Sequence, residues 1–439
     1  MIRGAAFMTD TARWCGAAFW TSKPLALPKM NEMYAAVLRE VDDLREAFVA
    51  AGFELYLVGG IVRDLHLGVS LDALDFDLTT AADPQTIKTL VDPLSTAVWS
   101  QGEKFGTIGC QIGGRPVEIT THRAESYNDA SRKPEVVFGD DIEVDLSRRD
   151  FTLNAMAIRL SDGELIDPFE GLVALERRVL VTPIEPEISF ADDPLRILRA
   201  ARFIARYELE VDPGVMAAGQ SLIDRMSIVS AERIRDEFDK LLSAPMPAAG
   251  LAFLVKVGAW PFVVSSVDGG TVEEIAAELD PSRNDLTLRR AIVFSHCAEN
   301  DRAEALSKLR YSNDEVRQLR LLLAGLDVVD AGGQRFDAST VRRLVDRVGF
   351  DKLGLLEELI AARGFDDRGL RDRLGELNAS EDLSNLKPQL TGEEIMALLA
   401  LEPGPEVGAA LGVLQERRFE EGPLDSAGEA DFLKKRYRR

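Results

Sequence analysis

The sequence predicts an α+β fold, in which an N-terminal head with a small mixed or antiparallel sheet and helices precedes an all-α neck, body and tail. Two observations support this prediction. Helix and strand patterns alternate in the first part of the chain, and from about Ile188 onward the patterns are helical. The length of 439 residues, with 46% hydrophobic and 29% charged residues, is enough for several domains with large cores.

Glycine separates the first predicted elements. Apolar side chains recur at helical spacing from Asn31 to Ala51, and Gly52 ends this helix before the buried strand FELYLVGG. The pair Gly59 and Gly60 ends that strand, and the segment IVRDLHLG after it is typical of a short helix. Helix and strand therefore alternate from the start.

Three further elements complete the head. We expect a strand around Phe76 and a helix from Pro84 to Leu90. The segments FGTIGCQI and RPVEITT read as a hairpin joined by a Gly113-Gly114 turn. The order helix, strand, helix, strand, helix, hairpin indicates a small α/β or α+β domain.

Helical patterns such as LRILRAARFIARY and EVRQLRLLLAGL fill the remainder of the chain. From these signals we expect five regions, which are a flexible N-terminal extension (1–30), the head (31–185), a helical neck (186–250), a helical body (251–386) and a helical tail (387–439).

Cysteine usage and hydropathy indicate a cytoplasmic protein. Cys15, Cys110 and Cys297 are odd in number and widely spaced, which favours a reducing compartment over a disulfide framework. No apolar run reaches the roughly 20 residues of a membrane-spanning helix. Asp10 and Arg13 interrupt the apolar core that a signal peptide needs. We therefore expect no membrane partner.

The formal net charge of −22 argues against indiscriminate binding of nucleic acid, because phosphate contacts need clustered Lys and Arg. Arginines nonetheless recur in DPLRILRAARFIAR, and the chain ends in KKRYRR. A local basic site on an acidic protein therefore stays open.

Two aspartates, Asp75 and Asp77, flank Phe76 within a strand pattern. Alternate residues of a strand face the same way, so both carboxylates share one face while Phe76 and Leu78 point into the core. Carboxylates on a rigid strand are suitable ligands for Mg²⁺, which binds oxygen and bridges substrate phosphates. A solvent-exposed strand face is the commoner explanation of such a pair on its own.

The segment LVGGIVRD adds a candidate anion site. A buried strand, the turn at Gly59 and Gly60, and a helix start bring backbone amides to a place where the helix dipole stabilises an anion. Arg63 could reach a triphosphate there, and a tight turn with a surface pair of Arg63 and Asp64 is the alternative. Together with Asp75 and Asp77, the segment places an anion site and a metal-binding pair on neighbouring strands.

These two segments resemble the head of the class II tRNA nucleotidyltransferases and bacterial poly(A) polymerases, within the DNA polymerase beta-like superfamily. Further matching blocks follow in the family's order: VEITTHRAESY, SRRDFTLNAMAI, IDPFEGL, DDPLRILRAARF and ERIRDEF. Ordered blocks from Phe53 to Leu242 are far more specific than any one of them. The resemblance implies a nucleotidyltransferase head and a base-recognition helix in the neck.

The block ADDPLRILR contains the candidate base reader. Pro194 suits the first position of a helix, and Asp193 suits the N-cap before it. Arg196 follows one turn later. A carboxylate accepts from an exocyclic amine and a guanidinium donates to a ring acceptor, a pattern that cytosine and adenine match and that uracil and guanine do not. The resemblance implies this use for Asp193 and Arg196.

Further arginines are expected to support the nucleotide. Arg199 and Arg202 continue on one helix face, where a solvated face is the alternative. By resemblance, Arg149 contacts the incoming nucleotide and Asp150 supports the site, although a structural ion pair also explains Asp150. Glu118 faces away from the core, either as a third metal carboxylate or as an exposed edge.

The loop from Arg123 to Val136 corresponds, by resemblance, to a flexible element that governs the change from C to A addition. Some members of the family also carry an HD phosphohydrolase domain. The segment LRRAIVFSHCAEN is similar to its core, but Cys297 stands where a metal-binding aspartate belongs. The three histidines, His66, His122 and His296, are too dispersed for a metal cluster, so we expect a degenerate HD-like region in the body.

Basic positions in the helical half could meet the tRNA acceptor arm by shape and phosphate contacts, with solvated faces as the alternative. These positions are Arg289, Arg290, Arg342, Arg343 and the terminal KKRYRR.

The sequence thus predicts template-independent addition or repair of the 3′-terminal CCA of tRNA from CTP and ATP, with Mg²⁺ and with release of pyrophosphate. The open alternatives are a poly(A) polymerase, an enzyme that adds only CC or only A, and a non-catalytic RNA-binding module.

Overall fold

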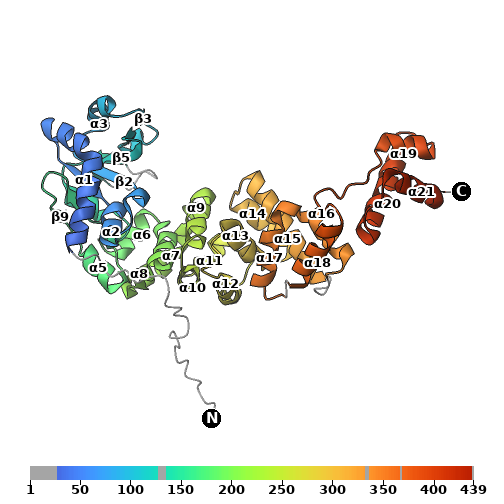
Figure 1. The fold of residues 1–439 in the computed structure, drawn as a ribbon. Helices are drawn as coiled ribbons and strands as arrows, with labels where there is room; N and C mark the ends of the chain where they lie inside the picture. Colours follow the sequence, from blue (N-terminus) through green and yellow to red (C-terminus); the bar gives the residue numbers. More distant parts are fainter. Residues whose placement is uncertain (1–26, 127–134, 332–335, 366–367, 438–439) are drawn as a thin grey trace, which may run out of the picture. The chain divides into compact units, whose positions relative to one another are not determined.

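The computed structural model describes residues 27–126, 135–331, 336–365 and 368–437. The chain divides into two compact units, one up to Met226 and one from Ser227 onward (Figure 1). This division falls inside the segment 186–250 that we predict as the neck, and the finer domain boundaries stay predictions. Most of the predicted extension (1–30) lies outside the described residues, and its last four residues belong to the first helix.

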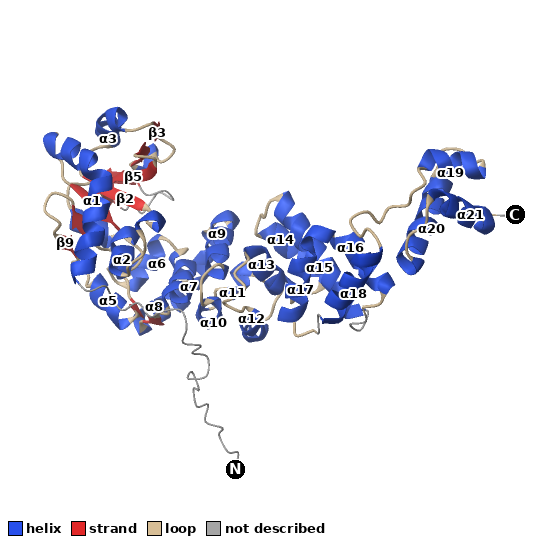
Figure 2. Ribbon diagram, in the orientation of Figure 1, coloured by secondary structure: helices blue, strands red, loops and turns tan. Residues whose placement is uncertain are grey.

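The first unit contains a seven-stranded sheet in the order β3-β4-β5-β2-β1-β8-β9 (Figure 2). The pair β2–β5 is parallel and the other neighbouring pairs are antiparallel, which confirms the predicted mixed sheet. Its strands are β1 (Leu55–Val58), β2 (Phe76–Thr80), β3 (Ala97–Trp99), β4 (Thr107–Ile112), β5 (Arg115–Thr121), β8 (Ala157–Arg159) and β9 (Leu165–Ile166). Two further pairs form separate two-stranded sheets, namely β6 (Arg123–Ser126) with β7 (Glu135–Phe138), and β10 (Val179–Leu180) with β11 (Glu210–Val211).

Three helices cover one face of this sheet, namely α1 (Leu27–Ala50), α2 (Gly60–His66) and α3 (Pro84–Val91). Their apolar side chains join alternate strand residues, such as Leu57, Phe76 and Leu78, in one buried cluster. Burial of this apolar face is the main stabilising contribution to the head. As the sequence predicts, Asp77 lies on the opposite face.

The hairpin of β4 and β5 turns at Gly113 and Gly114, with φ of +56° and +84°. A two-residue hairpin loop requires positive φ at both positions, which glycine adopts without strain.

The segment 123–136 is not a loop throughout, because Arg123–Ser126 and Glu135–Phe138 pair as the antiparallel strands β6 and β7. The rest of that predicted mobile loop, residues 127–134, lies outside the described residues.

Beyond the sheet, the chain is helical, as predicted. The first unit adds α4 (Ile142–Ser147), α5 (Gly171–Arg177), α6 (Pro186–Asp192), α7 (Arg196–Tyr207) and α8 (Pro213–Ser221). The second unit consists of α9 (Ala231–Leu242), α10 (Pro247–Val257), α11 (Trp260–Val263), α12 (Val272–Glu278), α13 (Leu286–Ser295), α14 (Glu299–Lys308), α15 (Asn313–Ala331), α16 (Ala338–Val348), α17 (Leu353–Ala362), α18 (Arg368–Ser380), α19 (Gly392–Leu399), α20 (Pro405–Glu421) and α21 (Ser426–Arg436). No helix in the described ranges is both long and apolar enough to cross a membrane.

Several basic residues that we considered for tRNA contact are internal. Arg289 is fully buried and donates to the carbonyl oxygens of Leu242 and Ala244, where it binds the end of α9. Arg290 and Arg342 are also buried, and each forms an ion pair. These three arginines therefore hold helices together, and the tRNA hypothesis for them is wrong.

His296 in the HD-like segment is a packing residue. Its side chain is 5% exposed, and its Nε2 lies 2.9 Å from one carboxylate oxygen of Glu278. The other oxygen of Glu278 accepts from Arg363. Cys297 accepts a hydrogen bond from the Ser266 hydroxyl. The histidine is thus part of a largely buried ion-pair cluster that joins α12 and α17.

Candidate active site

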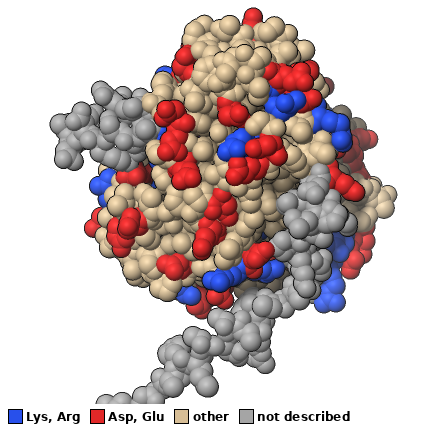
Figure 3. Space-filling model, turned by 90° about the vertical axis from the view of Figure 1, so that its left-hand side faces the viewer, with Lys and Arg blue, Asp and Glu red and all other residues tan. Residues whose placement is uncertain are grey.

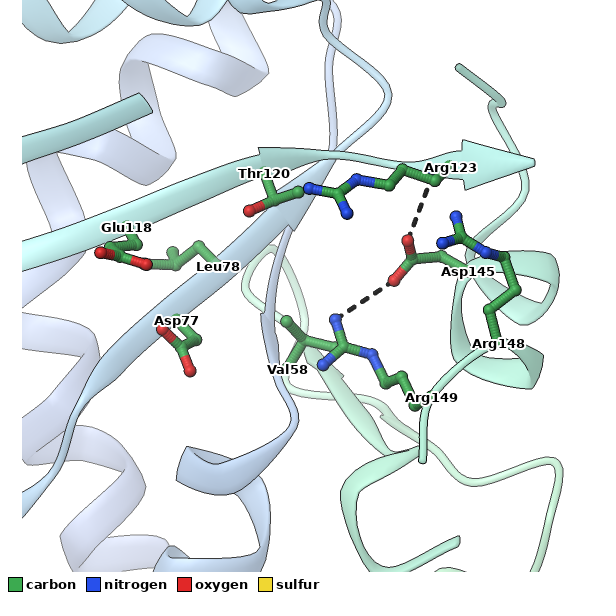
Figure 4. Close-up of a pocket in the computed structure, with 9 residues that line it drawn as sticks. All are labelled: Val58, Asp77, Leu78, Glu118, Thr120, Arg123, Asp145, Arg148 and Arg149. Carbon is green, nitrogen blue, oxygen red and sulfur yellow. Dashed lines mark hydrogen bonds and ion pairs between the residues drawn. The ribbon is translucent and has the colours of Figure 1, made fainter. Parts of the chain in front are cut away.

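A hollow of about 340 Å³ opens on the sheet face opposite α1, α2 and α3. Figure 4 shows two carboxylates on one side and three arginines on the other. The residues that line it are Val58, Asp77, Leu78, Glu118, Thr120, Arg123, Asp145, Arg148 and Arg149. One end is therefore suited to a cation and the other to an anion.

The acidic end is made by the parallel pairing of β2 and β5. Asp77 and Glu118 are register partners, so their side chains project from neighbouring strands toward the same side. Partial burial, together with the charges of Glu118 and then Asp75, raises the pKa of Asp77 to about 6, although Arg149 opposes the shift. The negative charges of Asp77, Glu118 and Asp75 therefore gather at this end, and Arg149 offsets them only in part.

Asp75 precedes β2 and is exposed, and its backbone carbonyl accepts from the Asp77 amide. In the described part of the chain, no group of three or more His, Cys, Asp or Glu side chains is arranged to hold a metal ion. Mg²⁺ commonly takes only one or two carboxylates and completes its shell with water and substrate phosphates. The raised pKa of Asp77 and this donor chemistry fit a hard divalent cation.

The basic end is organised around Asp145 on α4. This buried carboxylate accepts from the Arg123 amide through one oxygen and from the Arg149 guanidinium, at 3.2 Å, through the other (Figure 4). Arg148 lines the same wall. Asp145 thus orients the Arg149 side chain and fixes the backbone at Arg123. The charges of the three arginines exceed its own and leave a net positive wall.

Gly59 allows Arg149 to lie close to the turn after β1. A Cβ atom at Gly59 would lie 2.7 Å from Arg149 Nη1, so any larger residue would displace that guanidinium. The φ of +77° favours glycine in its own right. The Gly59 amide donates to the Met156 carbonyl, so the predicted use of this amide for an anion is replaced by a structural hydrogen bond. Gly60 is the first residue of α2. A Cβ atom added at Gly60 would lie 3.3 Å from Arg63 Nη2.

Arg63 is placed differently from the expectation that it reaches a phosphate. Its side chain is buried, donates to Asp64 and Asn154, and lies with its guanidinium carbon 4.7 Å from the centre of the Tyr207 ring. It does not line the hollow. Arg63 therefore connects α2, which follows the turn at Gly59, to α7. Its contacts favour a structural function over contact with a phosphate.

The start of α7 also differs from the prediction in detail. Asp193 follows α6 and Leu195 is the N-cap of α7, so Asp193 is not that helix's cap. The Asp193 carboxylate accepts from the Leu195 amide at 3.1 Å, which is the local alternative to capping for such a side chain. Arg196 donates to Ser189 Oγ at 2.6 Å and to the Arg148 carbonyl.

Neither Asp193 nor Arg196 lines the hollow itself. The bond from Arg196 to Arg148 nevertheless fastens the start of α7 to the basic wall. Arg196 of the predicted base reader therefore lies next to Arg148, the chain neighbour of Arg149, which is predicted to contact the incoming nucleotide.

A buried polar chain joins the segment after Arg149 to α7. Asp150 accepts from Arg199 through one oxygen, and from the Asn154 amide and the Phe151 backbone through the other. Burial alone would raise the pKa of Asp150, but the charge of Arg199 and these hydrogen bonds hold the pKa below its usual value. The guanidinium carbon of Arg202 lies 4.6 Å from the centre of the Phe203 ring.

Sequence reasoning missed Arg123, Asp145 and Arg148 as residues of the hollow. Arg148 could have been found, because it precedes Arg149 in the block SRRDF. Asp145 gives no signal of its own, since its position depends on where α4 packs. Asp77, Glu118 and Arg149 are the candidates that the structure does bring together.

Two segments of the chain match family models. Residues 55–181 match the poly A polymerase head domain, and residues 208–268 match a probable RNA and SrmB-binding site of polymerase A. A CCA-adding enzyme of Levilactobacillus brevis is 30% identical over 393 residues, which are 89% of this chain and 94% of that protein. One of Lactococcus lactis subsp. lactis is 32% identical over 385 residues, covering 85% and 90%.

Solved structures show the same fold. The CCA-adding enzyme of Bacillus stearothermophilus in complex with CTP has a TM-score of 0.77 at 25% identity, covering 91% of this chain and 98% of that one. The Thermotoga maritima CCA-adding enzyme complexed with tRNA_CCA has a TM-score of 0.65 at 20% identity, covering 93% and 98%. The head and the helical units that follow it therefore have known counterparts.

Proposed function

The chain belongs to the CCA-adding enzyme family and is a tRNA nucleotidyltransferase, and we propose that its hollow is where CTP and ATP are joined to the tRNA 3′ end. The observation that carries this proposal is the register pairing of Asp77 with Glu118, opposite Arg149 on the basic wall. A nucleoside triphosphate at a nucleotidyl transfer site needs both a cation at its phosphates and donors around them.

Nucleotidyltransferases are generally dependent on a divalent metal, and we propose Mg²⁺ held by Asp75 and Asp77. When bound, the ion would supply the charge that polarises the acceptor hydroxyl and neutralises the leaving pyrophosphate. The raised pKa of Asp77 supports the proposal, because a cation beside this carboxylate would offset the repulsion from Glu118.

The protein's own residues position the reactants. Arg149, oriented by Asp145 and lying against Gly59, donates to the triphosphate. The oxygen of the tRNA 3′ hydroxyl attacks the α-phosphorus as the bond to pyrophosphate breaks, and Glu118 accepts the hydroxyl proton. Gly60 supports the turn at which the phosphates lie.

Asp193 and Arg196 select the base. The carboxylate accepts from the exocyclic amine of cytosine or adenine, and the guanidinium donates to the ring acceptor beside it. Uracil and guanine would oppose both contacts. Arg199 and Arg202 act from the same helix, with Arg199 fixed by Asp150. Because this recognition uses protein groups alone, it needs no template.

We also place the enzyme in the cytoplasm, since its acceptor is tRNA and its cysteines suit a reducing compartment.

One assay tests the proposed function against its rivals. The purified chain is incubated with Mg²⁺, tRNA that lacks its 3′ end, and each nucleotide singly and in combination. Addition of C, C and A supports the proposal. A long A tail would identify a poly(A) polymerase, addition that stops at CC or requires CC would identify a partial enzyme, and no addition would identify a binding module.

A further inference from the structure

Two phenylalanines beside the hollow are exposed although they are large and apolar. Phe138, the last residue of β7, is 44% exposed, and Phe105 is 50% exposed. The Phe138 ring packs on Gly106, since a Cβ atom at Gly106 would lie 2.8 Å from Phe138 Cε1. Phe105 precedes Gly106 in the chain, and the Lys104 ammonium lies 4.8 Å from the centre of its ring. We call the exposed Phe138 ring on Gly106, together with the neighbouring Phe105, the aromatic ledge.

The ledge adjoins the hollow at a defined place. Phe138 is the register partner of Arg123, which lines the hollow. Directly opposed residues of an antiparallel pair project to the same side. The Arg123 guanidinium donates to Thr107 Oγ1 at 3.4 Å, and Thr107 follows Gly106 in the chain. The ledge is therefore at the rim next to Arg123.

The sheet order assigns the two sides of the hollow to the two reactants. In the order β4-β5-β2-β1, the Gly59 turn after β1 lies on one side of Asp77, and Glu118, Thr120 and Thr107 lie on the other. The proposed function places the incoming nucleotide at Gly59 and Arg149. The side of β5 and β4, where the ledge lies, is then left for the RNA that carries the attacking hydroxyl.

Stacking suits this protein better than a broad phosphate-binding surface. The net charge is −22, and the face of the head in Figure 3 carries many acidic side chains with smaller groups of basic ones. Aromatic side chains hold single-stranded bases without needing positive charge. The few arginines at the rim then supply phosphate contacts locally.

From these observations we propose that the base of the 3′-terminal nucleotide of the acceptor RNA stacks on Phe138, with Phe105 widening the surface. This inference rests on the proposed function, because it names the acceptor subsite of that same reaction.

Steady-state kinetics of the full chain test the proposal. Phe138→Ala should raise KM for tRNA lacking its 3′ end about tenfold or more, the loss typical of one stacked base. Binding of CTP without RNA should be unchanged. Phe138→Trp should restore KM, whereas Phe138→Leu, which keeps an apolar side chain on Gly106, should not. Phe350→Ala is the matched control, since Phe350 is 45% exposed and belongs to the second unit.

Salt dependence separates stacking from charge. Phe138→Ala removes no charge, so the slope of log KM against log salt concentration should stay the same, while Arg123→Gln should flatten it by about 0.7 for one phosphate contact. A short single-stranded RNA ending in 2-aminopurine supplies a direct probe, whose fluorescence the wild type should quench and Phe138→Ala should not.

The outcomes are distinguishable from failure of the proposed function. If the wild type adds no nucleotide, the proposed function is wrong. If the wild type adds CCA and Phe138→Ala keeps its KM and its quenching, or if Phe138→Leu matches Phe138→Trp, the stacking proposal is overturned while the function stands.

Discussion

Asp77 on β2 and Glu118 on β5 are register partners on parallel strands, and burial, followed by the charge of Glu118, raises the pKa of Asp77 to about 6. Two like charges on adjacent strands destabilise the folded protein unless a cation lies between them. The pair of Asp77 and Glu118 therefore costs stability, which indicates a functional reason for it. Substitutions of these two residues give the clearest tests of the site.

Glu118→Gln removes the proposed proton acceptor and preserves the shape of the side chain. We expect the rate of nucleotide addition to fall about 100-fold or more, as for loss of a general base. Glu176→Gln on α5, an exposed glutamate outside the hollow, is the control. A Glu118→Gln rate within twofold of the control would remove Glu118 from the mechanism.

Asp77→Asn should stabilise the metal-free protein while it removes activity. The pKa of Asp77 is raised from 3.8 to about 6, so between these pH values the folded state binds more protons than the unfolded state. The free energy of unfolding therefore falls as pH rises through this window, and the loss persists above it.

At pH 8, in the presence of a chelator, Asp77→Asn should gain on the order of 1 to 3 kcal/mol in urea denaturation. At pH 4 the gain should nearly vanish, because Asp77 is then mostly protonated in the wild type. Equal or lower stability of the variant at pH 8 would contradict the destabilising effect that burial and the charge of Glu118 are expected to have on the Asp77 carboxylate.

Gly59→Ala should weaken nucleotide binding beyond its cost in stability. The new Cβ would lie 2.7 Å from Arg149 Nη1, so Arg149 must move, and KM for CTP and ATP should rise. Gly52→Ala isolates the backbone contribution, since Gly52 has φ of +85° and no atom within 4 Å of the added Cβ. Each change should cost about 1 to 2 kcal/mol of stability. If both variants kept the wild-type KM, the close approach of Gly59 to Arg149 would not contribute to nucleotide binding.

Asp150→Asn should destabilise the first unit, because Asp150 is buried and paired with Arg199. Loss of one charge from a largely buried pair costs about 2 to 4 kcal/mol. Asp162→Asn tests the exposed equivalent, as Asp162 pairs with Arg159 and is 53% exposed, and should cost less than about 1 kcal/mol. Thermal or urea unfolding of both variants checks the difference, and equal losses would refute a structural Asp150.

Arg196→Ala should relax base selection more than it slows CTP addition. Without the guanidinium, uracil no longer faces an opposed donor, so UTP incorporation should rise relative to CTP. Arg196→Lys keeps the charge but not the planar pair of donors, and should restore selection only in part. Single-nucleotide incorporation kinetics give the ratio directly, and unchanged rejection of UTP by Arg196→Ala would exclude Arg196 as the reader.

Strand alternation was enough to predict that Asp77 and Glu118 both face away from the core. It could not predict that they are neighbours, because the pairing of β2 with β5 joins segments about 40 residues apart and depends on the whole sheet. The direction in which each carboxylate faces follows from local sequence, whereas their pairing does not.

Arginines show the same limit more sharply. Arg63 and Arg289 carry sequence signals like those of Arg149, yet both are buried against protein partners and only Arg149 lines the hollow. What covers a side chain depends on helices that pack from elsewhere in the chain. The predicted N-cap, Asp193, is two residues too early, since Leu195 is the N-cap of α7.

The most direct test of the central claim compares the wild type and Asp77→Asn on one tRNA that lacks its 3′ end, with Mg²⁺, CTP and ATP, and resolves products to a single nucleotide. We expect three added nucleotides from the wild type and none from the variant, which should remain folded in the same preparation. Extension by Asp77→Asn at the wild-type rate would contradict the assignment of the hollow as the catalytic site.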